Sequence, residues 1–277
     1  MIIDSHCHIY PRKIAGRAVE SIDRFYGGMA DGCHLDGTAE TLLLNGRVAG
    51  ISRFIVHSVA TAPEQARSIC AFIAQSVEAS KGAFTGLGAL HPDSEDLEGD
   101  FQYLLALGLK GVKLHPDFQK FEADSPRACR IYELCEENEV PVLVHTGDFR
   151  YNYSNPERIA RVLRDFPRLT LIGAHLGGWS VWDRALSALP DFPNIRVDTS
   201  SSFPWLSEEK AEEIIRAFGP ERVLFGTDYP MWDPRKDLEY FDRLSFTEDE
   251  REMIFWRNCA DIYQMTTGGK EEKVHVS

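Results

Sequence analysis

Short apolar runs alternate along the chain with longer segments whose apolar residues recur at helical spacing. The run RFIVHSV (53–59) is typical of a buried strand, and the segment 63–80 after it carries apolar residues from Ala66 to Val77 at intervals of three or four. The same alternation continues to the end of the chain. It predicts eight strands, the first within residues 1–10 and the others at 53–59, 84–90, 111–115, 141–147, 169–178, 194–200 and 222–230.

Polar residues and prolines mark where the helices begin. Ser125 stands before a proline and is a typical N-cap, and Ser207 has the same position before a later helix. Thr247 and Glu250 form a capping-box pattern. We therefore expect helices at 38–48, 63–80, 95–108, 126–138, from Pro156 onward, around 180–189, and at 208–218 and 248–265.

This order of elements predicts an α/β fold. Strict alternation of strand and helix favours a parallel sheet, and eight such units in 277 residues favour a closed (β/α)₈ TIM barrel over an open sheet. No G-x-G-x-x-G motif follows the first strand, which argues against a dinucleotide-binding fold. We expect one domain over 1–266, a cap formed by the long connection 11–50, and a frayed polar tail at 267–277.

Composition narrows the classes of partner. The net charge is −13, from 30 basic and 43 acidic residues, which argues against a nucleic-acid partner. No apolar run approaches the roughly 20 residues that span a bilayer, and no secretory signal precedes the first strand. The six cysteines contain no C-x-x-C pair, so we expect reduced thiols and a cytoplasmic protein. The sequence leaves the oligomeric state open, and a homo-oligomer is compatible with it.

The first ten residues carry the pattern with the most chemical content. In a regular strand, residues two apart share a face, so Asp4, His6 and His8 point one way while Ile3 and Cys7 point the other. Two neighbouring imidazoles at a strand end can bind one metal ion. Asp4 lies deeper and is expected to orient a ligand.

Other polar residues close the later apolar runs, where the active sites of barrel enzymes are built. A polar residue buried at such a strand end must be paired or must ligate something. The residues at this predicted rim are His6, His8, Lys113, His115, His145, His175 and Asp228. Their convergence on one barrel mouth predicts an active site there.

The motifs DSHCH, GVKLHP, VLVHTG, AHLGG and LFGTDYP, in this order, resemble those of the amidohydrolase superfamily. The chain is most similar to the amidohydrolase 2 branch, which holds aminocarboxymuconate-semialdehyde decarboxylase-like enzymes. The resemblance implies a TIM barrel with one divalent metal ion, held by His6, His8, His145 and Asp228. It makes Asp228 the proton-transferring acid as well, and His175 the residue that polarises the substrate or holds water. Zinc is the first choice on ligand type, with manganese or iron open.

The remaining rim residues have open roles. Lys113 can be a carboxylated bridge between two metals, an ammonium that binds a substrate carboxylate, or a structural lysine, and we favour the last two. His115, Arg150 and Trp179 are candidate substrate-binding residues. His57 is expected to be a rim or structural residue, as is His91.

The resemblance favours a hydrolase that cleaves an amide, lactone or ester-like bond in a small molecule through metal-activated water. The alternative is a non-oxidative decarboxylase or related lyase that acts on a small carboxylic acid at the same site. A third hypothesis is a metal-binding protein without activity. We expect a small, anionic substrate in either enzyme.

Overall fold

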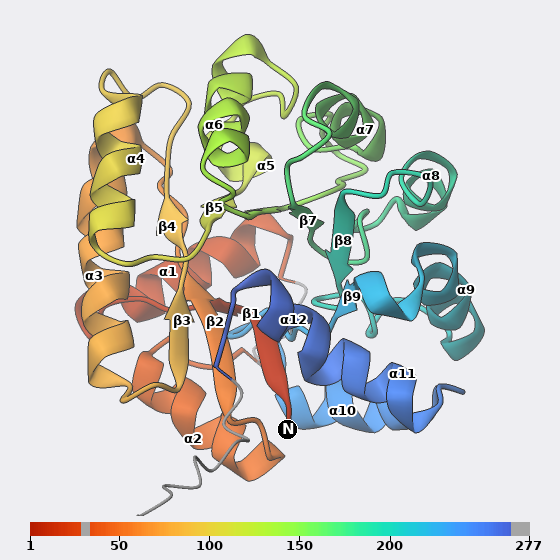
Figure 1. Cartoon of the computed structure of the whole chain (residues 1–277). Helices are drawn as coiled ribbons and strands as arrows, with labels where there is room; N and C mark the ends of the chain where they lie inside the picture. The colour runs from red at the N-terminus through yellow and green to blue at the C-terminus, as the bar shows by residue number, and fades with distance from the viewer. Residues whose placement is uncertain (29–33, 267–277) are drawn as a thin grey trace, which may run out of the picture.

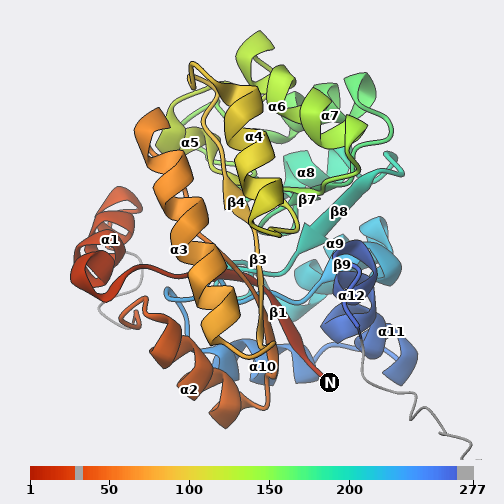
Figure 2. The ribbon, with the colours of Figure 1, turned by 60° about the vertical axis from the view of Figure 1, so that its left-hand side comes forward.

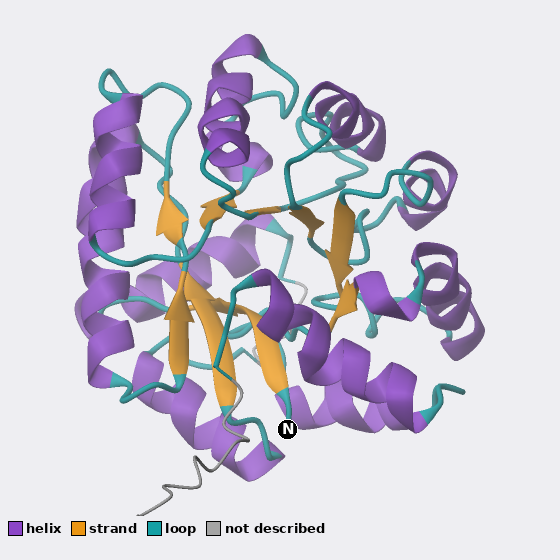
Figure 3. Ribbon diagram, viewed as in Figure 1, coloured by secondary structure: helices purple, strands orange, loops and turns teal. Residues whose placement is uncertain are grey.

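The computed structural model describes residues 1–28 and 34–266, and it has a ring of short parallel strands surrounded by helices (Figures 1 and 3). The cysteines within these residues are free thiols. Cys33 and the predicted tail 267–277 lie outside the described part. The strands are β1 (Ile3–His8), β2 (Arg53–His57), β3 (Phe84–Gly86), β4 (Gly88–Ala89), β5 (Val112–Leu114), β6 (Val142–Val144), β7 (Leu171–Gly173), β8 (Ile195–Asp198) and β9 (Val223–Leu224).

The strands follow each other around the ring in sequence order, and every pair is parallel. β1, β2 and β3 form one run and β4 to β9 the other. The predicted strand at 84–90 is divided at Leu87, because β3 pairs with β2 whereas β4 pairs with β5. The Leu87 amide still donates to Val56 O at 2.9 Å, so this segment connects the two runs.

Hydrogen bonds also join the first strand to the end of the last one. Ser5 N donates to Phe225 O at 2.9 Å, and His8 N donates to Tyr229 O at 2.7 Å. Cys7 and Tyr229 form a parallel bridge at the same place. The predicted α/β barrel is therefore confirmed, and its first and last strands meet beside His8.

The helices pack on the outside of the ring, as Figure 1 shows for α3, α4, α6, α7, α8 and α9. Ser125 and Ser207 cap helices as predicted, and Thr247 with Glu250 forms the predicted capping box. The α-helices are α1 (Arg12–Phe25), α2 (Ala39–Ala49), α3 (Ala66–Ala79), α4 (Leu97–Ala106), α5 (Pro116–Gln119), α6 (Pro126–Glu137), α7 (Pro156–Asp165), α8 (Trp182–Ala188), α9 (Glu208–Phe218), α10 (Pro234–Asp242), α11 (Glu248–Glu252) and α12 (Asn258–Ile262).

Some helices differ from the prediction. The connection 11–50 contains α1 as well as the expected α2, and Figure 2 shows α1 to one side of the strands. A π-helical turn, Met253–Arg257, separates α11 from α12 within the single helix expected to reach Met265. The sequence also did not predict α10, which starts after a proline-rich turn. Among the described helices, none is long and apolar enough to cross a membrane.

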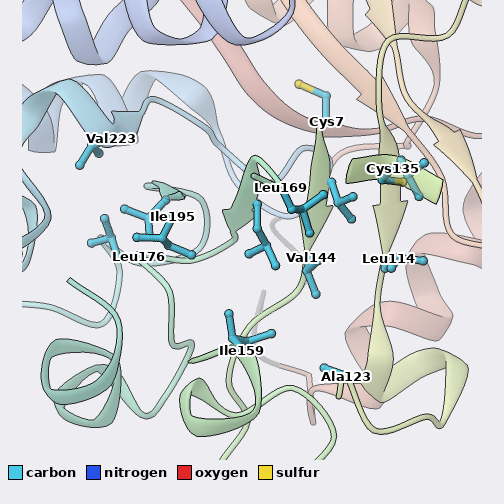
Figure 4. Packing of buried hydrophobic residues seen from close by; sticks show 14 of the residues in the cluster. Cys7, Leu114, Ala123, Cys135, Val144, Ile159, Leu169, Leu176, Ile195 and Val223 are labelled. Atoms are coloured by element: carbon cyan, nitrogen blue, oxygen red, sulfur yellow. The ribbon is translucent and has the colours of Figure 1, made fainter. Parts of the chain in front are cut away.

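Apolar residues pack in two layers. The larger layer lies between strands and helices and contains Cys7, Leu114, Val144 and Ile195 (Figure 4). The smaller layer fills the barrel interior on the side covered by α12, with members such as Ile55, Leu143, Leu224 and Tyr263. Two residues further along β2 and β6, the same interior face carries histidines. The barrel interior is therefore apolar at one end and polar at the other, and the polar end is where the strands finish.

One residue of the first strand faces differently from the prediction. Ile3 belongs to the interior layer with Ile55, although strict alternation from His6 and His8 would turn it outward. The pairing of β1 with β2 contains one extra residue between Asp4 and Cys7. Such a bulge reverses the face of the residues before it, so Ile3 and the two histidines can all point inward.

Candidate metal centre

Three acceptor atoms converge at the polar end of the barrel. Nε2 of His6 and Nε2 of His8 lie 3.3 Å apart. Asp228 Oδ1 lies 3.4 Å from each of them. Both histidines come from β1, whereas Asp228 comes from the loop after β9, so the seam of the barrel brings them together.

The spacing of these three atoms fits a metal ion. Ligand atoms that each lie about 2.1 Å from a tetrahedral metal ion are about 3.4 Å from one another. His6 Nδ1 lies 2.9 Å from Asp198 Oδ2, which assigns the proton to Nδ1 and leaves a lone pair on Nε2. Burial, together with the Lys113 charge, lowers the pKa of His6 to about 4, so its ring is neutral at pH 7. Two neutral imidazoles and a carboxylate make a donor set for a divalent cation.

A second pair of histidines lies beside the first. His145 Nδ1 and His175 Nε2 are 3.0 Å apart. His145 Nε2 is next to Gly147 O and His175 Nδ1 is next to Ser200 O, which places the protons on those outer nitrogens. The two inner nitrogens then face each other with lone pairs, an arrangement that a cation would relieve. His175 lies close to His6, at 5.3 Å between ring centroids, and the assignment of His145 as a ligand stays a prediction.

Asp198 contacts one histidine of each pair, His6 and His175, although the sequence pattern did not single it out. Its carboxylate bonds His6 Nδ1 and accepts from the backbone N of His175 at 3.1 Å. The Ser200 hydroxyl donates to Asp198 and lies 2.9 Å from His175 Nδ1. Burial alone would raise the pKa of Asp198, but its interactions with His6, His175 and Ser200 together outweigh burial and lower the pKa to about 2. Asp198 closes the apolar strand NIRVD, which is the same pattern that identified the other rim residues.

Asp4, which was expected to orient a ligand, contacts the backbone of His6 and the residue before Asp228. Its carboxylate accepts from Thr227 Oγ1 at 2.6 Å and from Thr227 N at 3.0 Å. It also accepts from the backbone N of His6 at 3.2 Å. One buried carboxylate thus fixes both the strand that carries the histidines and the residue before Asp228.

Two of the predicted site residues lie beyond the strand ends in strained backbone. His175 follows β7 by two residues with φ of 61°, and Asp228 follows β9 by four residues with the same φ. Ser201 after β8 also has a positive φ, of 46°. Non-glycine residues seldom adopt this region, and they concentrate at functional sites. The strands are shorter than predicted, because the chain turns out of the strand conformation at these positive-φ residues. The turns bring the side chains to the metal-binding end of the barrel.

Lys113 lies at this centre as well. Its Nζ is 3.0 Å from His6 Nε2, and the side chain is buried. Burial lowers the pKa of Lys113 to about 8. The ammonium therefore faces the same atom that would bind a metal.

His115 and His57 support the site from two sides. The His115 ring is stacked on His145 at 3.9 Å, and its Nε2 lies 3.1 Å from the Tyr26 hydroxyl. The ligand atoms of His115, Asp117 and His145 come within 4.8 Å of one another, but the two parallel rings do not aim their nitrogens at one point. His57 packs edge-on against His6 and His8, with centroids at 4.8 and 4.4 Å.

A small cavity of about 30 Å³ lies over the site, lined by Tyr26, His145, His175, Trp179, Ser201, Asp228, Met231 and Trp232. Trp179, a predicted pocket residue, forms part of its wall. Tyr26 comes from the segment after α1, and no pattern in the sequence connects it with His145. The walls are mostly aromatic, and Ser201 and Asp228 are among the polar residues that line them.

Arg150, a predicted substrate-binding residue, has its guanidinium engaged by protein groups. Its Nε and one terminal nitrogen donate to the buried Asp148 at 2.9 and 2.6 Å, and the other donates to Phe25 O at 2.5 Å. The guanidinium also lies over the rings of Tyr26 and Trp179 at 5.0 and 5.6 Å. These contacts fasten the end of α1 to the rim.

Replacing Arg150 by Ala should therefore lower stability more than replacing a surface arginine. The change leaves the Asp148 carboxylate buried without its cation. We expect a loss of about 2 kcal/mol, below the 3–5 kcal/mol of a fully buried pair because Arg150 is partly exposed. Urea unfolding measures it. Arg184→Ala, which breaks an exposed pair with Glu157, is the control and should cost about 0–1 kcal/mol. Equal losses in the two variants would contradict this role of Arg150.

A family model described as Amidohydrolase matches residues 3–265. The chain is 25% identical over 201 residues to the uncharacterized protein y4mH of Sinorhizobium fredii, which covers 63% of this chain and 66% of that protein. It is 30% identical over 128 residues to the decarboxylase orsB of Emericella nidulans, and this match covers 38% of this chain and 38% of that protein. The chain thus spans less than two thirds of either relative's length.

Solved structures share the fold. An uncharacterized TIM-barrel protein of Bordetella bronchiseptica has a TM-score of 0.79 at 24% identity, over 95% of this chain and 98% of that chain. The 5-carboxyvanillate decarboxylase of Sphingomonas paucimobilis has a TM-score of 0.72 at 17% identity, over 96% and 99%. The dihydroxybenzoic acid decarboxylase of Polaromonas sp. JS666, with manganese and the inhibitor 2-nitroresorcinol, has a TM-score of 0.72 at 16% identity, over 99% of both chains.

Proposed function

The chain belongs to the amidohydrolase family, and on this premise we propose that it is a metal-dependent carboxy-lyase that removes CO₂ from a small aromatic acid. The observation that carries the proposal is the convergence of His6, His8 and Asp228 at 3.3–3.4 Å beneath an aromatic cavity. This arrangement contains donor atoms for a metal ion, and its carboxyl group, that of Asp228, can also transfer a proton. The enzyme class follows from the family, whereas the reaction is the proposal.

The comparisons reverse the ranking of the two enzymatic hypotheses, hydrolysis and decarboxylation. The sequence favoured hydrolysis, with decarboxylation as the alternative. A curated relative that is 30% identical is a decarboxylase, and two of the structural neighbours named above are decarboxylases of aromatic acids. These findings support the lyase better than the hydrolase.

In this proposal His6, His8, His145 and Asp228 hold one divalent metal ion. When bound, the ion supplies positive charge that draws electrons from the substrate while the C–C bond breaks. Asp198 keeps the His6 proton on Nδ1, so that Nε2 stays available to the ion. Asp4 holds the loop that presents Asp228.

The chemical step needs one proton. The bond between the ring carbon and the carboxyl carbon breaks, CO₂ leaves, and the electron pair stays on the ring carbon. Burial alone would raise the pKa of Asp228, but the neighbouring histidines outweigh the effect of burial and hold the pKa well below its usual range, so the carboxylate is ionised before the substrate binds. Asp228 would take a proton from water or from the bound acid, give that proton to the ring carbon and return to the carboxylate, so one proton is consumed for each carboxylate. His175 lines the same cavity as Asp228 and would orient the substrate.

The surroundings support an anionic aromatic substrate. Trp179 and Tyr26 form flat walls, and their rings meet edge to face at 4.9 Å. The buried Lys113 ammonium supports attraction of a substrate carboxylate to the same centre. His115 lies behind His145 and would stabilise the wall.

Product analysis tests the reaction. The enzyme loaded with manganese or zinc would be offered a panel of hydroxybenzoates and a matched panel of lactones. Release of CO₂ with a decarboxylated arene supports the proposal. Ring-opened lactones without CO₂ would overturn it in favour of the hydrolase.

We expect one metal ion per chain. Protein purified without added metal should contain about one equivalent by elemental analysis, and anomalous scattering should show a single peak among His6, His8 and Asp228. The same measurement distinguishes zinc, which the ligand types favour, from the manganese held by the Polaromonas enzyme. Two peaks about 3.5–4 Å apart would instead identify Lys113 as a carboxylated bridge and contradict this expectation.

A further inference from the structure

Asp228 has a second contact on the side away from the histidines. Its Oδ2 accepts a hydrogen bond from Ser201 Oγ at 2.6 Å. Ser201 Oγ in turn accepts from the indole Nε1 of Trp232 at 2.7 Å. Ser201 is buried, and both residues line the cavity over the site.

The direction of this chain is determined by its members. An indole N–H can only donate, so Trp232 uses one lone pair of the Ser201 oxygen. Ser201 has a single hydroxyl proton, and the short contact to Asp228 takes it. Asp228 Oδ2 is thereby an acceptor, and the other oxygen, Oδ1, is left facing the two histidines.

Such a constraint matters because an aspartate carboxylate is not fixed by its own rotamer preference. Rotation about χ2 is broad, so the plane of the carboxylate needs an external contact to hold it. The backbone at Ser201 has φ of 46°, which turns the hydroxyl toward Asp228 at a conformational cost.

We propose that Ser201 and Trp232 are positioning residues for Asp228, and that their hydrogen-bond chain aims Oδ1 of the carboxylate at the metal-binding histidines. This inference rests on the proposed metal centre but not on the identity of the reaction. It assigns a specific task to two residues that the sequence did not identify.

Metal affinity tests the proposal without any substrate. Manganese alone would be titrated against a competing chelator, with the wild type and three variants. Ser201→Gly removes the hydroxyl and suits the positive φ, so the fold should not be strained by it. The dissociation constant of this variant for manganese should rise about 10- to 100-fold, the usual effect of a residue that orients a ligand.

Trp232→Phe keeps a ring but removes the N–H, and should raise the dissociation constant by a smaller factor. Trp205→Phe alters the neighbouring, exposed tryptophan and should change nothing.

A double variant separates positioning from general packing. If Trp232 acts through Ser201, adding Trp232→Phe to Ser201→Gly should cause no further loss of affinity. Thermal unfolding of the metal-free proteins should give the same midpoint for Ser201→Gly and the wild type. Unchanged affinity in Ser201→Gly, or additive losses in the double variant, would overturn the inference while the metal centre stands. A wild type that binds no manganese or zinc would overturn both.

Discussion

Asp228→Asn is expected to abolish nearly all turnover, by about 10³–10⁴-fold, and to weaken metal binding at the same time. The amide has the shape of the carboxylate but cannot carry the transferred proton. The Ser201 hydroxyl would also select the amide oxygen as its acceptor, which would turn the NH₂ group toward His6 and His8. A donor would then stand where the metal needs a lone pair.

Two measurements check this expectation, kcat with any substrate found and metal content after dialysis. Asp242→Asn is the matched control, because that carboxylate is exposed and pairs with Arg251 at the surface. The control should keep full rate and full metal. An Asp228→Asn enzyme that retains both would remove Asp228 from the centre of the mechanism.

His175→Asn should separate rate from metal binding. The Nδ1 of His175 is next to Ser200 O, its backbone N donates to Asp198, and its Nε2 faces His145. If it orients the substrate without being an essential ligand, the variant keeps the metal and loses rate by about 10²–10⁴-fold. Elemental analysis and kcat on one protein preparation provide the answer.

His91→Asn is a suitable comparison, because His91 lies at the rim after β4 and accepts from the backbone N of Asp93. It should keep both rate and metal. If His175→Asn emptied the site while Asp228→Asn kept metal and rate, the two roles would have to be exchanged.

The residues that sequence could identify share one property. His145 directly follows an apolar run, and His6 and His8 lie at the end of a buried strand, where a polar side chain requires a partner. Asp228 and His175 stand a few residues further on, in recognisable motifs. Local pattern was sufficient for these residues because strand direction already determines where they meet.

The residues that sequence missed depend on contacts between distant segments. Ser201 meets Asp228 across 27 positions, and Tyr26 reaches His115 across 89. Serine and tyrosine are common in ordinary turns and helix ends, so composition does not separate these two from others. Asp198 is different, since it ends a predicted strand and could have been selected by the rule that found His145.

The extra residue in β1 shows where the prediction of side-chain faces from strand alternation fails. The rule assigned His6 and His8 to the correct face but placed Ile3 on the wrong one. A bulge depends on the pairing of two strands, and a single strand's pattern does not contain it. The error is confined to the residues before the bulge, so the predicted face of His6 and His8 was unaffected.

The position of the site on the barrel seam has a consequence for biosynthesis. His6 and His8 are synthesised before Asp228, which follows 220 positions after His8. The three-atom site therefore does not exist on a nascent chain, however much metal is present. Capture of the proposed metal ion would therefore be a late event that joins the two ends of a finished ring. A chain truncated before residue 228 would retain its histidines without the carboxylate that completes the site.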